Sequence, residues 1–438
     1  MVRHIVGAVV VTAVVLTGCS SQPASQEPST APSTPSSASP APVDRSSPKG
    51  PQGKPFDVTA ASMTIHSFEG KPETGSGGFR MNCFPLWRQV EPRRGEFNWP
   101  AFDSALQNTK SWGGQQIIYS FCGTPEWAAG KVTDPAAEVF GKDSTAPPSR
   151  ISYFEDYVRA VARRYKGQID AYEIWNEATS PQFWQGTPDE MAEMTERASR
   201  IIHAEDPEAL VTSASIQTHR SDYYKGFFPP YLKSLKKRGW PVDVWNGHFY
   251  PAGRGGPAAR RDQIAMMRKT LAKAKAPARP LWDTEVNYFT GEPGINPAGR
   301  VTGERAQAWA VRTYLDGWRL NVPRNYWYFW TLKYDQFPGI QTRPGLPATK
   351  ALATFSSWVV GSRFNGCAQK GAVVSCFFAK DGSDFTIAWA EGKKDSANVT
   401  ANFPLKRAAE VCRLTDGSCS RTKKLELDQL PVKIQSEA

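Results

Sequence analysis

The chain of 438 residues is predicted to be an α/β protein, a (β/α)8 TIM barrel followed by a small C-terminal antiparallel β domain. Over residues 56–361, short β-rich runs alternate with long amphipathic stretches, which is typical of parallel βα units. Eight units are found, the number that closes a barrel, and a span of about 300 residues suits that fold. Over residues 362–438 the pattern changes to short runs separated by Asp-Gly turns, which predicts a β-sandwich-like domain.

The first 19 residues have the pattern of an export signal. Arg3 and His4 precede an apolar run from Ile5 to Leu16, which is too short to span a bilayer comfortably. The ending Leu16–Cys19 resembles the bacterial lipobox, which implies that the Cys19 thiol is lipidated and becomes the mature N-terminus. The alternative is an ordinary secretory signal with an incidental Cys. We therefore expect an exported protein, anchored through Cys19 to the outer face of the cell membrane.

Residues 20–55 form a Ser/Pro/Ala tract with almost no large apolar residue. Such a tract cannot bury a core, so it is predicted to be an extended, disordered tether. The formal net charge is +11, but Lys and Arg are dispersed over the polar faces of expected helices, and no nucleic-acid motif is present. Nucleic acid is therefore not an expected partner. The basic surface favours either attraction to an anionic cell envelope or simple solubility.

The eight barrel strands are expected over 61–66, 79–84, 116–121, 169–177, 210–214, 242–248, 280–285 and 325–330. Helices are expected over about 99–112, 153–165, 189–204, 222–237, 258–274, 304–320 and 347–358. The first strand has the weakest pattern, and a long irregular loop follows Trp127. In the C-terminal domain, strands are expected over 373–378, 385–389, 410–414 and 430–434. No binding motif is found there, so the domain is either a packing appendage or a sugar-binding module.

Seven cysteines are present, and six remain when Cys19 is set aside, an even number for an oxidising compartment. Six cysteines allow fifteen pairings. Closeness along the chain favours Cys367–Cys376 and Cys412–Cys419, which leaves Cys83 and Cys122. The barrel prediction supports this third pair, because both residues lie at or just past the ends of neighbouring strands on one rim.

Two carboxylates are the candidate catalytic groups. Glu177 ends the fourth expected strand and Glu285 ends the seventh. In a parallel barrel, chemistry is located at the C-terminal ends of the strands. These two positions lie on roughly opposite sides of the barrel mouth, so their side chains can converge on one ligand. Two carboxylates about 5–5.5 Å apart are what a retaining glycosidase requires.

Other chemistries have less support. No His/Asp cluster shows ligand spacing, so we expect no metal and no cofactor, and the Gly-x-Ser-x-Gly motif of a Ser nucleophile is absent. Glu173 and Asp283 lie deeper on the same strands, where structural roles are expected. The fifteen tryptophans either stack on sugars or pack in the core.

Several motifs together resemble glycoside hydrolases of clan A, the retaining (β/α)8 enzymes with catalytic glutamates on strands four and seven. The resemblance is greatest to the family 39 β-xylosidase/iduronidase type and to nearby family 5 enzymes. The motifs run through most of the barrel: Trp87–Pro92, Gly95–Trp99, Thr124–Ala128, Ile174–Glu177, His248–Tyr250 and Thr284–Glu285. The chain departs from the commonest pattern at Ala178, where a Pro usually follows the acid/base.

The resemblance implies a role for each matching residue. Glu177 would be the acid/base, Glu285 the nucleophile, and Asn176 would bind the sugar 2-OH. Arg80 and Tyr250 would hold Glu285 ionised and oriented. The other substrate-binding candidates are His248, which would lie beside Glu285, Trp330 as a sugar platform, and Trp87 and Trp127 from the shared motifs. Taken singly, Asn176 could instead cap a turn and His248 could be a satisfied polar group.

We therefore expect a retaining glycoside hydrolase that cleaves a polysaccharide or oligosaccharide by double displacement. Glu177 must be protonated near neutral pH, because the charge of Glu285 and a partly dry site disfavour a second carboxylate. The anchor and tether favour an envelope polysaccharide, such as an arabinogalactan, over imported glycan. The alternatives are a transglycosylase that remodels envelope glycan and a non-catalytic glycan-binding lipoprotein. The sequence does not determine the sugar, the linkage or exo against endo action.

Overall fold

The computed structural model describes residues 56–436, except residues 60, 67, 69, 290–298, 333–337, 393–394 and 396–398. The predicted signal peptide 1–19 with Cys19 and the predicted tether 20–55 lie outside the described residues. Among the helices that are described, none combines the length and apolar character needed to cross a membrane.

The larger sheet is parallel and has the order β6-β5-β4-β3-β2-β10-β9-β8-β7. Its strands are β2 (Ser62–Ile65), β3 (Gly78–Met81), β4 (Gln116–Ser120), β5 (Ala171–Glu173), β6 (Leu210–Thr212), β7 (Ile216–Gln217), β8 (Trp245–His248), β9 (Leu281–Val286) and β10 (Asn325–Trp330). The edge strands β6 and β7 are two pieces of one segment, 210–217. A bridge from Thr212 to Val244 joins the end of β6 to the segment that leads into β8. The sheet therefore closes, and the predicted eight-stranded barrel is confirmed.

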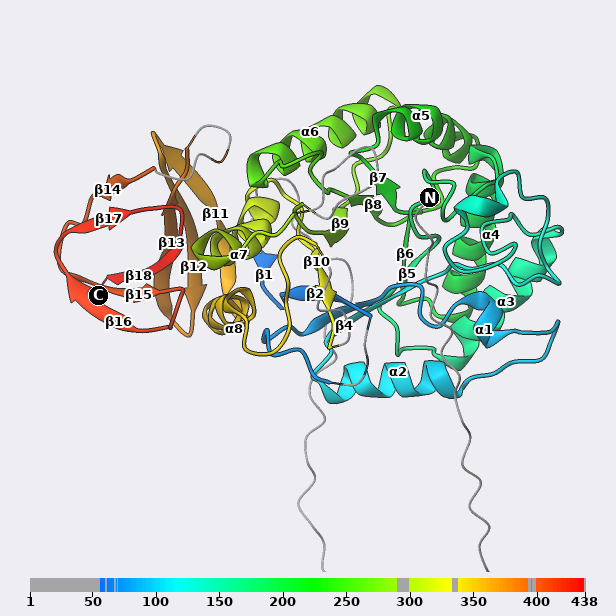
Figure 1. Ribbon diagram of the computed structural model, residues 1–438, viewed down its shortest axis with the longest axis horizontal. Helices are drawn as coiled ribbons and strands as arrows, with labels where there is room; N and C mark the ends of the chain where they lie inside the picture. Colours follow the sequence, from blue (N-terminus) through cyan, green and yellow to red (C-terminus); the bar gives the residue numbers. More distant parts are fainter. Residues whose placement is uncertain are drawn as a thin grey trace, which may run out of the picture. The chain divides into compact units, whose positions relative to one another are not determined.

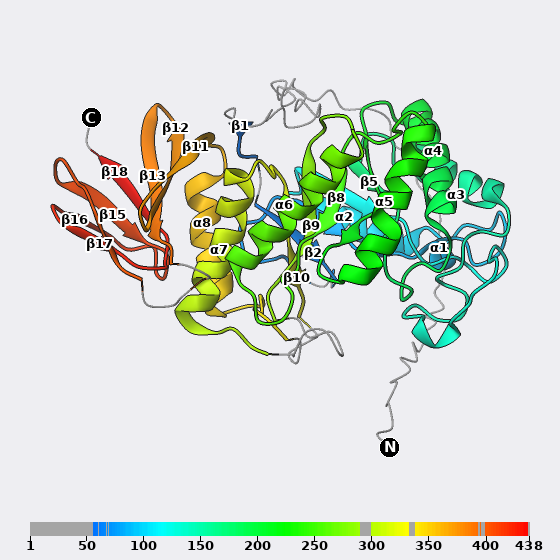
Figure 2. The ribbon, with the colours of Figure 1, turned by 90° about the horizontal axis from the view of Figure 1, so that it is seen from above.

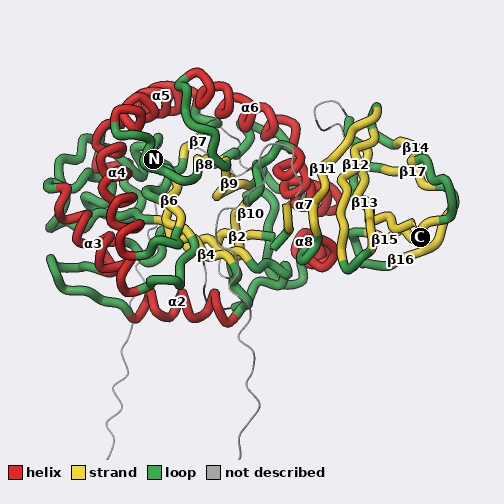
Figure 3. Tube along the Cα trace, turned by 180° about the vertical axis from the view of Figure 1, so that it is seen from behind, coloured by secondary structure: helices red, strands yellow, loops and turns green. Residues whose placement is uncertain are grey.

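Helices surround the barrel, as Figure 3 shows. They are α1 (Trp87–Val90), α2 (Pro100–Ser111), α3 (Ile151–Arg164), α4 (Pro188–Glu205), α5 (Ser221–Lys237), α6 (Pro257–Lys273), α7 (Gly303–Arg319) and α8 (Pro347–Val359), with a 3-10 turn at Pro135–Ala137. Each end of α2–α8 lies within two residues of the predicted boundary. In α4, the Thr187 side chain accepts a hydrogen bond from the Glu190 backbone N–H, and Pro188 occupies the first turn.

The C-terminal domain contains an antiparallel sheet of order β1-β11-β12-β13-β18-β15-β16. Its strands are β1 (Phe56–Asp57), β11 (Arg363–Lys370), β12 (Val373–Lys380), β13 (Ser383–Ala390), β15 (Ala409–Arg413), β16 (Cys419–Thr422) and β18 (Val432–Ser436), and β14 (Ala401–Phe403) pairs with β17 (Leu425–Leu427) in a second small sheet. The strand β1 precedes the barrel in the chain but pairs with β11, so both ends of the barrel segment are tied to this sheet.

One face of this antiparallel sheet packs on the barrel helices α7 and α8 (Figures 1 and 2). Trp318 and Phe355 of these helices stack with centroids 5.7 Å apart, and Trp318 also contacts Phe364 and Phe378 of the sheet. Burial of such aromatic surface makes the domain a packing partner of the barrel.

The three predicted disulfides are confirmed. Cys367–Cys376 and Cys412–Cys419 each link paired strands of the C-terminal sheet. Cys83–Cys122 joins the segments that follow β3 and β4, neighbouring strands of the barrel. This third bridge lies on the same rim as the candidate catalytic residues, because both cysteines follow the C-terminal ends of their strands.

Candidate active site

The barrel brings Glu177 and Glu285 together at the C-terminal ends of its strands. Glu285 belongs to β9, and Glu177 lies four residues beyond the end of β5. One carboxylate oxygen of each, together with a ring nitrogen of His248, all lie within 4.8 Å of one another. The glutamates are almost buried, with exposures of 5% and 6%, so water has little access to either charge.

Arg80 of β3 is fully buried and binds Glu285 and the deeper carboxylate Glu173. Its Nη1 donates to Glu285 Oε2 at 2.7 Å, and its Nε and Nη2 donate to the two oxygens of Glu173 at 2.9 and 2.7 Å. Burial disfavours the charge of Glu173, but Arg80 holds the pKa of this carboxyl below its usual value. Glu173 therefore anchors Arg80 from below, the structural role expected for this deeper position.

Glu285 is held on two sides. Arg80 binds one oxygen, and the Tyr250 hydroxyl donates to the other at 2.7 Å. Burial raises the pKa of Glu285, and Arg80 and Tyr250 oppose this shift. Burial also raises the pKa of Tyr250 well above its usual value, so this hydroxyl stays protonated and donates. The arrangement orients the Glu285 side chain through both oxygens, and the ionised state that the resemblance implies stays a prediction.

Glu177 has different neighbours. Its Oε2 accepts a hydrogen bond from Gln217 Nε2 at 2.7 Å, and its Oε1 lies 2.8 Å from His248 Nδ1. Its φ of 44° lies in the left-handed region, which is uncommon for a residue other than glycine. The backbone N–H of Glu177 donates to Ser215 Oγ at 2.8 Å, and this contact supports the turn that presents the side chain.

His248 lies beside Glu285, as expected, because the ladder between β8 and β9 shifts register after Gly247 and makes these two residues partners. Its Nδ1 is 3.8 Å from the nearest Glu285 oxygen. The same nitrogen is closer to Glu177, at 2.8 Å, a contact that the sequence did not predict. Burial lowers the pKa of His248 to about 4, so the ring is neutral at neutral pH.

Asn176 is buried, and its Oδ1 accepts a hydrogen bond from Arg80 Nη2 at 2.8 Å. This contact orients the amide and joins Asn176 to the Arg80 cluster. Its predicted contact with a sugar 2-OH stays a prediction.

Two of the tryptophans named as substrate contacts are in the core, which corrects those assignments. Trp87 is fully buried and stacks on Tyr157 at 5.2 Å. Trp330 is also fully buried, and its Nε1 donates to the Gly70 carbonyl. Neither ring has an exposed face on which a sugar could stack in this structure. Tyr328 is the partly exposed ring of β10, and it lies 6.0 Å from Tyr250.

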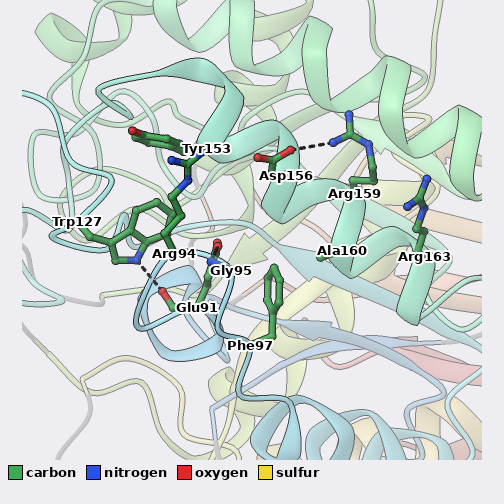
Figure 4. Close-up of a pocket in the computed structure, with 10 residues that line it drawn as sticks. All are labelled: Glu91, Arg94, Gly95, Phe97, Trp127, Tyr153, Asp156, Arg159, Ala160 and Arg163. Atoms are coloured by element: carbon green, nitrogen blue, oxygen red, sulfur yellow. Dashed lines mark hydrogen bonds and ion pairs between the residues drawn. The ribbon is translucent and has the colours of Figure 1, made fainter.

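Trp127 lines a pocket on the outer flank of the barrel (Figure 4). This pocket has a volume of about 330 Å³ and lies against α3. Neither Glu177 nor Glu285 lines it. Trp127 Nε1 donates to the backbone carbonyl of Glu91. The Glu91 carboxylate accepts from Trp87 Nε1 and from the Gly95 backbone N–H, both at 2.8 Å. The two motifs at 87–99 thus form a loop that is held by hydrogen bonds between its own residues, and the hydrogen bond from Trp127 also supports it.

Glu177, His248 and Glu285 also have a spacing that could suit a metal ion. Arg80 already neutralises Glu285 in this cluster, and Tyr250 and Gln217 bind the other carboxylate oxygens. A cation there would compete with a buried guanidinium. The absence of a metal from the chemistry stays a prediction.

Sequence reasoning missed Gln217 and Tyr328. Gln217 is 2% exposed and lies in β7, beyond the end of the strand expected over 210–214. The small residues Ser213–Ser215 hid that continuation, because they carry no apolar alternation. Tyr328 lies within the expected eighth strand, where the resemblance pointed to Trp330, and the ladder with β2 shifts register between Trp327 and Trp330.

Replacing Arg80 by Met is expected to destabilise the fold by about 3–5 kcal/mol, because the change leaves two buried carboxylates without their cation. Denaturation in guanidinium chloride measures the loss. Arg93→Met is the matched control, because Arg93 and its partner Glu96 are mostly exposed and this ion pair contributes little to stability. A loss for Arg80→Met no larger than that of the control would contradict the role given to Arg80.

Several solved structures have a similar architecture. No family model matches the chain, and no curated protein matches it. Among solved structures, a family 39 glycoside hydrolase from the gut symbiont Bacteroides cellulosilyticus WH2 has a TM-score of 0.62 at 16% identity, over 87% of this chain and 81% of that one. A monomeric β-xylosidase from Caulobacter crescentus CB15 has a TM-score of 0.64 at 14% identity, over 88% and 98%.

A family 30 endoxylanase from Clostridium papyrosolvens C71 has a TM-score of 0.54 at 14% identity, over 89% of this chain and 98% of that one. At such identities the likeness establishes the fold. The chain therefore has the architecture of the family 39 and family 30 glycoside hydrolases, a TIM barrel joined to a β domain.

Proposed function

We propose that this protein is a retaining glycoside hydrolase. The observation that carries the proposal is the pair Glu177 and Glu285, whose nearest oxygens lie within 4.8 Å and whose surroundings differ. In an inverting enzyme the two carboxyls are farther apart, because a water must fit between one of them and the sugar. The short separation here suits direct attack by a carboxylate. Glu285 is paired with a cation, whereas the side-chain oxygens of Glu177 contact Gln217 and neutral His248. When the surroundings of two carboxyls keep one ionised and the other protonated, the ionised one can act as nucleophile and the protonated one as acid.

The reaction proceeds in two steps. In the first, the Glu285 carboxylate attacks the anomeric carbon, and the bond to the leaving oxygen breaks as Glu177 gives that oxygen its proton. In the second, Glu177, now a carboxylate, takes a proton from water while the water oxygen attacks the anomeric carbon and releases Glu285. Two inversions give net retention. Arg80 and Tyr250 keep Glu285 in place during both steps.

The substrate that we propose is a polysaccharide or oligosaccharide of the cell envelope, such as an arabinogalactan. The support is the lipobox at Cys19 and the tether at 20–55, which would hold the enzyme at the outer face of the membrane. The solved structures named above include a β-xylosidase and an endoxylanase, so xylosides are the second class to test.

A panel of aryl pyranosides and furanosides, including xylosides, arabinosides and galactosides, tests the function. NMR of the first sugar released should show the anomeric configuration of the substrate. Release of the opposite anomer would contradict the retaining mechanism. Products extended by added acceptor sugars would identify a transglycosylase. Glycan binding without hydrolysis of any substrate would instead support a binding lipoprotein.

Gln217 is expected to contact the substrate beside Glu177. Its Nε2 binds Glu177, while its buried Oε1 has no hydrogen-bond partner among the described residues. An unpaired buried acceptor is costly, so a hydroxyl of the bound sugar is expected to donate to it. Gln217→Leu should raise KM and lower kcat/KM by about tenfold to hundredfold. Gln182→Leu, a change at an exposed residue of the loop after Glu177, is the control. An unchanged kcat/KM for Gln217→Leu would refute this contact.

A further inference from the structure

We infer that Thr284, Asn246 and Thr212 form a hydrogen-bond relay that fixes the tautomer of His248. In this tautomer His248 Nδ1 accepts a hydrogen bond from the protonated Glu177 carboxyl and so keeps the acid proton on Glu177. The inference rests on the proposed function and adds to it three buried residues beneath His248. All three are fully buried on neighbouring barrel strands. They are positioning residues, because they act on Glu177 only through His248.

The relay begins at Thr212. Its hydroxyl donates its single hydrogen to the Ser213 carbonyl at 2.9 Å. Thr212 Oγ1 can therefore only accept from Asn246, whose Nδ2 lies 3.4 Å away. This requirement sets the orientation of the Asn246 amide, with its nitrogen toward Thr212 and its oxygen toward Thr284.

The next two links follow from the first. Asn246 Oδ1 lies 2.7 Å from Thr284 Oγ1, and two oxygens at this distance need a hydrogen between them, which only Thr284 can supply. The Thr284 hydroxyl is then used as a donor. At 3.1 Å from His248 Nε2 it can only accept, so His248 carries a hydrogen on Nε2.

The last link is His248 itself. A neutral imidazole with a hydrogen on Nε2 has a bare Nδ1, which is an acceptor. Glu177 Oε1 lies 2.8 Å from that nitrogen, and the short contact requires a hydrogen on Glu177. The second oxygen of Glu177 accepts from Gln217 at 2.7 Å, which matches the carbonyl oxygen of a protonated carboxyl.

This relay serves both steps of the mechanism. In the free enzyme it stabilises the protonated acid, because a hydrogen bond donated by a group favours its protonated form. After the proton leaves, the Glu177 carboxylate faces a bare nitrogen, and repulsion between the lone pairs favours its return. The charged and titratable groups that face Glu177 and His248 from the surrounding elements are Arg80, Glu173, His219, Tyr250 and Glu285.

Thr284→Val tests the relay because it keeps the shape of the side chain and all of these charges. Without an acceptor for Nε2–H, His248 can place its hydrogen on Nδ1 and donate to a Glu177 carboxylate. The alkaline limb of the kcat/KM profile, which reports loss of the acid proton in the free enzyme, should move down by about one pH unit. Thr284→Ser should restore it, and Thr212→Val should give a smaller shift in the same direction.

Thr64→Val is the matched control. Thr64 is equally buried and donates to the Thr284 backbone carbonyl at 3.2 Å, but it lies outside the relay. It should leave the alkaline limb in place. A purely structural role for Thr284 would lower kcat without moving the limb.

Nitrogen-15 NMR of the histidine rings gives a readout that needs no activity. The chain has five histidines, so the His248 signals can be resolved. The wild type should show a protonated Nε2 and a bare Nδ1, and Thr284→Val should show both tautomers. A protonated Nδ1 in the wild type, or a limb and tautomer unchanged by Thr284→Val, would overturn the relay. If the wild type hydrolyses no glycoside, the proposed function fails while the NMR result still decides the tautomer.

Discussion

Replacing Glu285 by Gln is expected to lower kcat on activated aryl glycosides by about 10⁴-fold or more, because the amide cannot form the glycosyl-enzyme bond. The change is nearly isosteric, and an amide can still bond to Arg80 and Tyr250, which now hold the two carboxylate oxygens. The fold should therefore remain intact. Steady-state rates at saturating substrate measure the effect.

Glu126→Gln is a matched control for Glu285→Gln, because Glu126 follows strand β4 of the same barrel and its side chain is half exposed. It should have wild-type kcat. A fluorinated activated glycoside should trap the intermediate in the wild type, and mass spectrometry should locate the sugar on the peptide that contains Glu285. Retained activity in Glu285→Gln, or a label on a different residue, would remove Glu285 as the nucleophile.

The positions of the two carboxylates could be predicted because they depend on the strand pattern alone. A residue at the C-terminal end of a parallel strand faces the same rim whichever side chains surround it. Glu177 and Glu285 both satisfy this condition, as do Cys83 and Cys122, which form the predicted bridge. Apolar residues at helical spacing likewise predicted the seven long helices.

The side chains that contact these carboxylates depend on the register between neighbouring strands, which the periodicity of the sequence does not report. His248 is the ladder partner of Glu285, yet its ring nitrogen also lies 2.8 Å from Glu177, a contact that its position along the strand does not reveal. Trp330 is fully buried in a strand whose ladder with β2 is irregular, so the role that the resemblance implied for it does not fit this structure. The strand β1, two residues long, pairs with a strand some 300 positions later, and so short a segment has no periodicity of its own.

Replacing Glu177 by Ala is expected to have an effect that depends on the leaving group. For a substrate with a poor leaving group, loss of the acid should lower kcat/KM by about 10²–10⁴-fold. For an activated aryl glycoside the first step needs little protonation, so kcat/KM should change far less. The second step still lacks its base, and the glycosyl-enzyme on Glu285 should accumulate and give a burst of phenol followed by slow turnover.

Azide separates this mechanism from simple damage to the site. It is an anion that attacks without a general base, and the Ala side chain leaves space and removes a carboxyl from the region between Gln217 and His248. Azide should therefore restore turnover of the activated substrate in Glu177→Ala and yield a glycosyl azide with the configuration of the substrate. The wild type should show no such acceleration. A product of inverted configuration would mean that azide attacks the substrate directly from the face that Glu285 normally occupies, which would exclude the double displacement. Equal losses for good and poor leaving groups, without rescue, would mean that Glu177 supports the fold of the site and donates no proton.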